Sequence, residues 1–99
     1  MTIDELLAEA AKIEGWRIIP IDNRHEVRCN VRGRLHCPIT AVARIRGRYL
    51  DASNFDGGVA QNALGISQRN INLIVGAADF RGAPQRKKLL KALNLEEIK

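Results

Sequence analysis

The sequence has few aromatic side chains, few cysteines and no long hydrophobic run. Only 4% of its 99 residues are aromatic, whereas 45% are hydrophobic, so aliphatic side chains must build one compact core. Two cysteines are too few for a disulfide scaffold, and in a reducing compartment they would remain thiols. The longest apolar runs, such as Leu73 to Val75, are far too short to cross a membrane.

Targeting signals are also lacking. The first residues, Met1 to Glu5, are acidic where a secretory signal would be basic, and the C-terminus carries no prenylation box. We therefore expect a cytoplasmic protein that does not engage a membrane. The length predicts a single domain over residues 1–99, and a charged fraction of 27% is ordinary for a folded chain.

Positive charge is concentrated in two parts of the chain. The net charge is +5, from 16 Lys and Arg against 11 Asp and Glu. The excess lies in residues 16–50, where every basic residue is arginine, and in residues 81–99. Arginine favours bidentate contact with phosphate or carboxylate, so the first block predicts contact with nucleic acid or with an acidic protein surface. A solvated charged face is the alternative interpretation. The candidate contact residues are Arg24, Arg28, Arg32, Arg34, Arg44, Arg46 and Arg48.

Hydrophobic periodicity and turn residues predict an α+β domain. We expect a small antiparallel hairpin or three-stranded sheet packed with about five short helices, two of which form a helix-turn-helix-like corner. A loop is expected over 48–57. The predicted strands cover 16–21, 26–32 and 34–36, and the predicted helices cover 2–14, 38–46, 58–64, 67–78 and a last segment from Pro84.

The same patterns predict which side chains face inward. In the second strand Val27, Cys29 and Val31 alternate with polar residues, so these three should be buried. The helix after Pro38 should bury an apolar side made of Ile39, Val42, Ala43 and Ile45. The last helix should bury its leucines and turn its basic side chains, Arg86, Lys87, Lys88 and Lys91, toward water.

One short motif indicates a function. Residues 59–75 are Val-Ala-Gln-Asn-Ala-Leu-Gly-Ile-Ser-Gln-Arg-Asn-Ile-Asn-Leu-Ile-Val. Gly65 permits a sharp turn, Ile66 fills the angle between two helices, and Ser67 caps the second helix. This segment resembles the helix-turn-helix of bacterial and phage DNA-binding proteins. The resemblance covers about one sixth of the chain. It departs from the usual pattern at Gln61, where a small residue normally stands between the two helices.

The resemblance implies a face that reads base edges in double-stranded DNA. Gln and Asn can contact adenine, and Arg can contact guanine. Phosphate contacts would have to come from the arginines outside the motif, because residues 51–80 have a net negative charge. DNA readers of this size are usually symmetric, so a homodimer is expected with this function. The base-reading residues would be Ser67, Gln68, Arg69 and Asn72, with Leu73 beside them.

A second resemblance covers most of the chain. It is carried by Cys37-Pro38-Ile39, Leu64-Gly65-Ile66-Ser67, Ala77-Ala78-Asp79 and a terminal leucine helix. The arrangement is similar to small uncharacterised proteins of bacteria and their phages, which are often inhibitors or regulators. This resemblance implies a protein–protein interaction module, in which a basic face docks on an acidic partner. No cofactor is implied.

Metal and catalytic chemistry have weak support in the sequence. His25, Cys29, His36 and Cys37 lie close together, but their spacing matches no zinc motif, and adjacent residues of a strand point apart. A reactive Cys37 at a helix start is conceivable on chemical grounds, although a small core cysteine is the commoner case. We therefore expect no metal site and no enzyme.

The position of the arginines distinguishes the two functional hypotheses. If Arg28, Arg32 and Arg44 share a face with Gln68 and Asn72, the geometry favours DNA binding. If they lie on the other side of the molecule, it favours docking on an acidic protein.

Overall fold

The computed structural model describes residues 1–48 and 59–98. The loop expected over 48–57 lies outside these residues except for Arg48, and so does the expected helix start at Gly58. Within them the chain forms a three-stranded antiparallel sheet and short helices, which confirms the predicted α+β class. The elements are α1 (Ile3–Ala11), β1 (Trp16–Ile21), β2 (Arg24–Val31), β3 (Arg34–His36), α2 (Pro38–Ile45), α3 (Val59–Leu64), α4 (Gln68–Asp79) and α5 (Arg86–Ala92).

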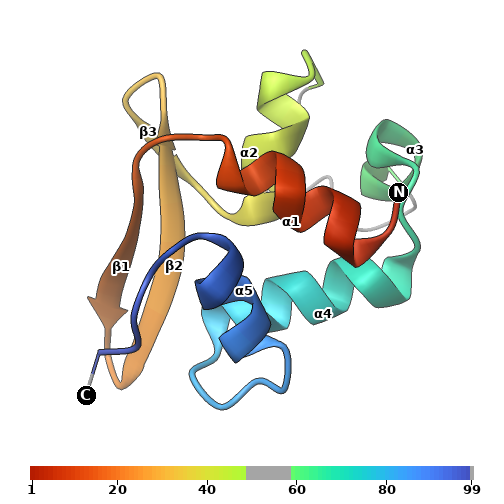
Figure 1. Cartoon of the computed structure of the whole chain (residues 1–99). Helices are drawn as coiled ribbons and strands as arrows, with labels where there is room; N and C mark the ends of the chain where they lie inside the picture. The colour runs from red at the N-terminus through yellow and green to blue at the C-terminus, as the bar shows by residue number, and fades with distance from the viewer. Residues whose placement is uncertain (49–58, 99) are drawn as a thin grey trace.

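The sheet forms one side of the molecule and the helices lie against one of its faces (Figure 1). The strand order is β1-β2-β3, with β2 in the centre and packed against α2 and α4. Helix α1 lies across α2, and α5 packs against α4 and α1. None of the helices in residues 1–48 and 59–98 is long and apolar enough to cross a membrane.

Two-residue turns connect the strands and fix their register. Ile21 pairs with Arg24 across the first turn, so β2 begins two residues earlier than the predicted strand 26–32. The pairing extends because Asp22 adopts a left-handed φ of 51°, which Asp tolerates in turns. Val31 pairs with Arg34 across the second turn, and β3 has the predicted bounds.

Helix α1 begins with the predicted capping box and ends earlier than expected. The side chain of Thr2 accepts from the Glu5 amide, and the Glu5 side chain accepts from the Thr2 amide. The helix was predicted to extend to residue 14, but its C-cap is Lys12. The indole of Trp16 donates to the carbonyl oxygen of Ala10 at 2.7 Å. The same carbonyl also accepts the amide of Ile13 at 3.0 Å, so a tighter last turn and the tryptophan together occupy the acceptor that a longer α-helix would give to residue 14.

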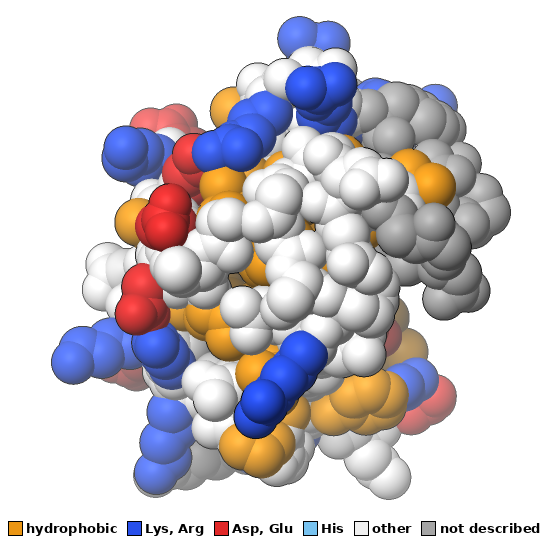
Figure 2. All heavy atoms as spheres, turned by 90° about the vertical axis from the view of Figure 1, so that its right-hand side faces the viewer, with side chains coloured by type: hydrophobic (Ala, Val, Ile, Leu, Met, Phe, Trp, Pro, Cys, Tyr) orange, Lys and Arg blue, Asp and Glu red, His pale blue; other side chains and the backbone are white. Residues whose placement is uncertain are grey.

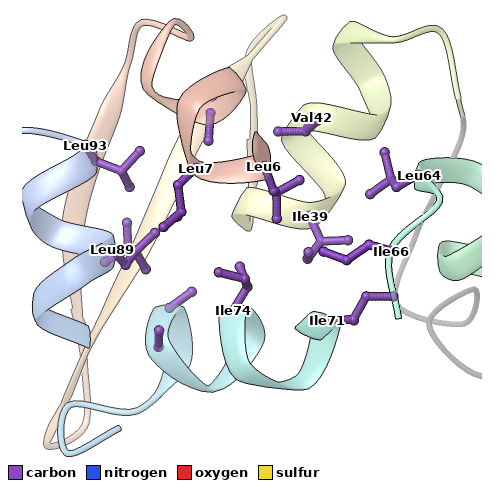
Figure 3. Packing of buried hydrophobic residues seen from close by; sticks show 14 of the residues in the cluster. Leu6, Leu7, Ile39, Val42, Leu64, Ile66, Ile71, Ile74, Leu89 and Leu93 are labelled. Atoms are coloured by element: carbon purple, nitrogen blue, oxygen red, sulfur yellow. The ribbon is translucent and has the colours of Figure 1, made fainter. Parts of the chain in front are cut away.

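The main core lies where α1, α2, α4 and α5 meet, as Figure 3 shows. Val27, Cys29 and Val31 are buried as their alternation predicts. The expected burial of the terminal leucines is also confirmed. Because the core is almost wholly aliphatic, its stability depends on close packing of branched side chains. The labelled core side chains are Leu6, Leu7, Ile39, Val42, Leu64, Ile66, Ile71, Ile74, Leu89 and Leu93.

Two predictions about which side chains are buried were wrong. Ile45 was assigned to the buried side of α2, yet 62% of it is exposed. It lies in the last turn of α2, where it borders the open groove between α1 and α2 instead of the closed core. Arg86 was expected to face water, yet only 2% of it is exposed. It lies at the start of α5, directly over the C-terminal end of α4, where buried carbonyl groups need donors.

Arg86 connects four parts of the chain. Its Nη1 donates to the carbonyls of Ala77 at 3.0 Å and Ala78 at 3.3 Å, at the end of α4. Its Nη2 donates to the carbonyl of His25 on β2. Its Nε and Nη2 also contact the two carboxylate oxygens of Glu97 at 3.1 and 3.2 Å. One guanidinium thus joins α4, the sheet and the C-terminal segment to α5.

A neighbouring arginine covers the same sheet edge. Strand β3 pairs only with residues 29–31 of β2, so the earlier part of β2 has a strand on one side only. There the carbonyl of Val27 accepts from Arg28 at 3.1 Å, as that of His25 accepts from Arg86. Arg28 also pairs with Asp79 at 2.9 Å and Glu26 at 2.7 Å. Arginine side chains therefore satisfy an edge that could otherwise pair with another strand.

We predict that Arg86→Met destabilises the fold by about 3 kcal/mol. The variant keeps the volume but leaves buried carbonyls of α4 and β2 without their donor. Urea unfolding followed by circular dichroism measures the change. The control is Lys87→Met on the adjacent exposed position, for which we expect a change within about 0.5 kcal/mol. Equal effects of the two substitutions would contradict the role assigned to Arg86.

Candidate functional site

The α3–α4 corner has the local geometry that the helix-turn-helix resemblance implies. Gly65 adopts a left-handed φ of 62° between the helices. Ile66 is buried to 2% exposure, and the Ser67 hydroxyl accepts from the Asn70 amide at 3.2 Å. The glycine turns the chain, the isoleucine fills the angle between the helices and the serine caps α4, so a tight corner forms between two short helices.

The proposed base-reading residues are partly engaged with one another. The Gln68 side chain donates to Asn72 at 2.9 Å and accepts from Gln61 at 3.3 Å. Gln61 stands where helix-turn-helix proteins usually have a small residue, and it uses its side chain to form a hydrogen bond from α3 to α4. Ser67 is exposed but serves as the N-cap, and Asn72 and Arg69 are exposed. Arg69 is therefore the one charged side chain among the four, and a reading face would depend on it.

The surface around this corner carries little charge. Figure 2 shows the side of the molecule where α3 and the beginning of α4 lie. Uncharged polar atoms and backbone cover most of its centre, and Lys and Arg side chains gather mainly at its margins. Phosphate contacts flanking a reading helix normally come from basic or hydrogen-bonding groups close beside it. The described surface next to α4 provides few basic groups for such contacts.

Three of the seven candidate contact arginines are held in intramolecular contacts. Arg28 pairs with Asp79 and Glu26, as described above. Arg46 pairs with Glu9 of α1 through two hydrogen bonds of 2.9 and 2.5 Å. Arg24 lies over the ring of Phe80, 5.5 Å from its centroid. These three side chains hold elements of the fold together. The other four candidates are grouped by where they lie and not by a lack of contacts, since Arg44 also takes part in an interaction within the protein.

The remaining four arginines, which we call the arginine cluster, gather at one end of the molecule. They are Arg32, Arg34, Arg44 and Arg48. Arg32, Arg44 and Arg48 line one shallow hollow of about 290 Å³, together with Ile45. Arg34 and Arg44 both act on His36 electrostatically, which places them near it. The cluster thus combines the β2–β3 turn with the C-terminal end of α2.

Ile45 is the functional candidate that sequence reasoning missed. Its large exposed fraction places an aliphatic side chain among the arginines. On its other side it borders a groove of about 450 Å³ between α1 and α2, whose floor includes Ile13 and Val42. Periodicity alone assigned Ile45 to the core. The sequence signal for its exposure was its place in the last helical turn, next to a run of alternating arginines.

The arginine cluster and the α4 corner lie in different parts of the molecule. In Figure 1, α4 runs through the lower half, whereas the β2–β3 turn and the C-terminal end of α2 lie at the top. Arg32 and Arg44 belong to these upper segments, but Arg28 pairs with Asp79 of α4, which is seven residues after Asn72 and so on the same helical face. Two of the three arginines named in the criterion therefore favour docking on an acidic protein, and the third is already paired with carboxylates beside α4.

The two cysteines lie in different surroundings, with Cys29 buried and Cys37 half-buried. Cys29 donates to the Glu14 carbonyl at 3.4 Å, and burial raises the pKa of its thiol to about 11. Cys37 and Thr40 lie 3.3 Å apart through sulfur and hydroxyl oxygen. Both cysteines are free thiols. A thiol with a raised pKa is a poor nucleophile, so Cys29 is a packing residue.

His36 lies beneath the arginine cluster. Burial lowers its pKa from 6.5, and the charges of Arg44 and Arg34 lower it further. Its Nε2 is buried and has no hydrogen-bond partner among the described residues. The neutral imidazole is therefore the form that the folded state favours.

Comparison of the chain with protein-family models, with curated proteins and with solved structures finds no match. The functional argument consequently depends on the geometry described above.

We predict that Gly65→Ala destabilises the α3–α4 corner by about 1 kcal/mol. A side chain at a left-handed φ is strained, although an added Cβ would meet no close contact. The matched control is Gly76→Ala, inside α4 with open space around it, which should stabilise the protein by up to about 1 kcal/mol. Thermal unfolding measures both effects, and the same sign for the two would contradict the assigned corner.

We predict that the stability contributed by His36 declines as the pH falls below about 6.5. The pKa of His36 is lower in the folded state, so the unfolded chain binds the proton first and gains stability as the pH falls. Urea unfolding between pH 5 and 7.5 measures this decline, and His36→Gln should remove it. An imidazole that titrates at or above its ordinary pKa in NMR spectra would refute the prediction.

Proposed function

We propose that the protein is a small, non-enzymatic regulatory module that binds an acidic surface of another protein through the arginine cluster. The observation that carries this proposal is the gathering of Arg32, Arg44 and Arg48 around the exposed Ile45. Acidic side chains of the partner would pair with the arginines, while an apolar side chain would contact Ile45. A central apolar contact surrounded by arginine is typical of protein interfaces.

The apolar component supports a protein partner over a nucleic acid. A phosphate backbone offers no apolar contact for an exposed aliphatic side chain, so DNA bound here would leave the apolar surface of Ile45 without a partner to bury it. The adjoining groove between α1 and α2 is also mainly apolar. A protein surface can satisfy both features at once, because its acidic residues alternate with apolar ones.

The conformation of Arg32 is a second support. Arg32 and Gly33 both have positive φ values, 53° and 80°, as in the tight hairpin turns that favour Asn or Gly. Arginine in the left-handed region costs roughly 1 kcal/mol. The two-residue turn requires this conformation, and it places a long cationic side chain at the tip of the hairpin where Asn or Gly would be less strained.

DNA binding through α4 is the second candidate function. It is favoured by one observation, the formed corner with left-handed Gly65, buried Ile66 and the Ser67 cap. In this alternative Arg69 would read a base and a homodimer would present two copies of α4. The uncharged surface around the corner weighs against it, since affinity for DNA depends mostly on phosphate contacts.

We predict that the double variant Arg32→Asn, Arg48→Gln loses the partner and yet folds more stably. Asn relieves the left-handed strain, so loss of binding could not be attributed to unfolding. Immobilised protein is exposed to nuclease-treated extract of the native source, and the retained proteins are compared between variants. We expect at least a tenfold loss, because breaking charge pairs across an interface costs about 2–5 kcal/mol.

The matched control is the double variant Arg17→Gln, Arg69→Gln, which also removes two positive charges but at positions outside the cluster. This control should retain the partner. If it instead abolishes binding, and if the wild-type protein binds duplex DNA with a strong salt dependence, the DNA alternative replaces the proposal. Retention of the same proteins by all three chains, or of none by the wild type, also contradicts docking through the arginine cluster.

A further inference from the structure

A second basic hollow lies far from the arginine cluster in the chain. It measures about 830 Å³ and lies between the 81–84 connection, α5 and the C-terminal segment. Its polar lining consists of one carboxylate and several basic side chains. Its apolar lining comes from Leu90, Leu95 and Pro84. The lining basic residues are Arg81, Arg86, Lys87 and Lys91.

A carboxylate of the chain itself occupies the strongest donor position in this hollow. Glu97 contacts the Nε and Nη2 edge of Arg86 at 3.1 and 3.2 Å, and Arg81 approaches it at 3.6 Å. The bidentate edge of a guanidinium is also the preferred site for a phosphate. Glu97 lies in a segment without helical or strand hydrogen bonds, and its side chain is 35% exposed.

Two further cations of the hollow, Lys87 and Lys91, have no carboxylate partner among the described residues, whereas Arg81 approaches Glu97 and donates to the Ile98 carbonyl. Lys87 and Lys91 are four residues apart on α5 and therefore lie on one helical face, where like charges repel. Neither forms an ion pair with a described residue, whereas Lys88 between them pairs with Asp4 at 2.6 Å. One carboxylate thus faces four positive charges, and an added anion would lower the repulsion.

We propose that this hollow binds a small organic phosphate, whose phosphate group takes the place of Glu97. The phosphate would be held by Arg81, Lys87 and Lys91 and by the freed edge of Arg86. The organic part would contact Leu90 and Leu95. Glu97 then acts as an internal competitor that closes the empty site. This site is independent of the proposed function, because it shares no residue with the arginine cluster.

The test uses phenyl phosphate as the organic phosphate and inorganic phosphate as the free anion, with binding followed by amide NMR shifts. We expect shifts confined to residues 81–97 and their neighbours. Phenyl phosphate should bind about tenfold more tightly than inorganic phosphate, because burial of its ring adds to the charge contacts. Equal binding of the two would overturn the organic part of the proposal and leave a simple anion site.

Variants separate a binding site from a structural ion pair. Glu97→Gln should strengthen phenyl phosphate binding several-fold by removing the competitor. Lys87→Gln with Lys91→Gln should weaken it about tenfold, and the matched control Lys88→Gln should leave it unchanged. The two lysines are exposed, so their replacement leaves the fold intact. No binding at about 10 mM phenyl phosphate, or binding insensitive to these variants, overturns the proposal.

Discussion

The buried guanidinium of Arg86 is the interaction on which the arrangement of the other elements depends. It donates to the last carbonyls of α4, to the free edge of β2 and to the carboxylate of Glu97. An aliphatic core supplies most of the burial energy but little direction, because dispersion contacts are weakly oriented. Five fixed donors in one plane supply that direction. The position of α5 relative to the sheet, and the hollow beside it, follow from this one side chain.

Arginine serves three purposes in this chain, and the tertiary structure separates them. Arg86 and Arg28 satisfy carbonyl groups at the edge of the sheet. Arg46 joins α2 to α1 through Glu9. The arginine cluster, with Arg32 at a left-handed turn position, forms a basic surface at the β2–β3 turn and the C-terminal end of α2. A basic composition therefore overstates the charge that a partner can use, since about half of the candidate contact residues are occupied within the fold.

The α3–α4 corner shows how a local motif can form without the surroundings that its usual function needs. Gly65, Ile66 and Ser67 fix the corner by backbone conformation, packing and capping, and none of these requires DNA. The neighbouring surface decides whether such a corner reads bases. Here that surface is mostly uncharged at its centre, and the arginine cluster belongs to the β2–β3 turn and the C-terminal end of α2 instead of to α4. Within the fold, the corner orients α4 under the core.

The sequence by itself determined the element types, their order, most of their bounds and the inward-facing residues of β2, because periodicity and caps act over a few residues. It also determined the α3–α4 corner. Only the tertiary structure decided that Arg86 is buried, that Ile45 is exposed and that the arginines divide between the fold and its surface. These outcomes depend on which elements meet in space. A side chain's helical position cannot reveal whether a carbonyl, a carboxylate or water lies opposite it.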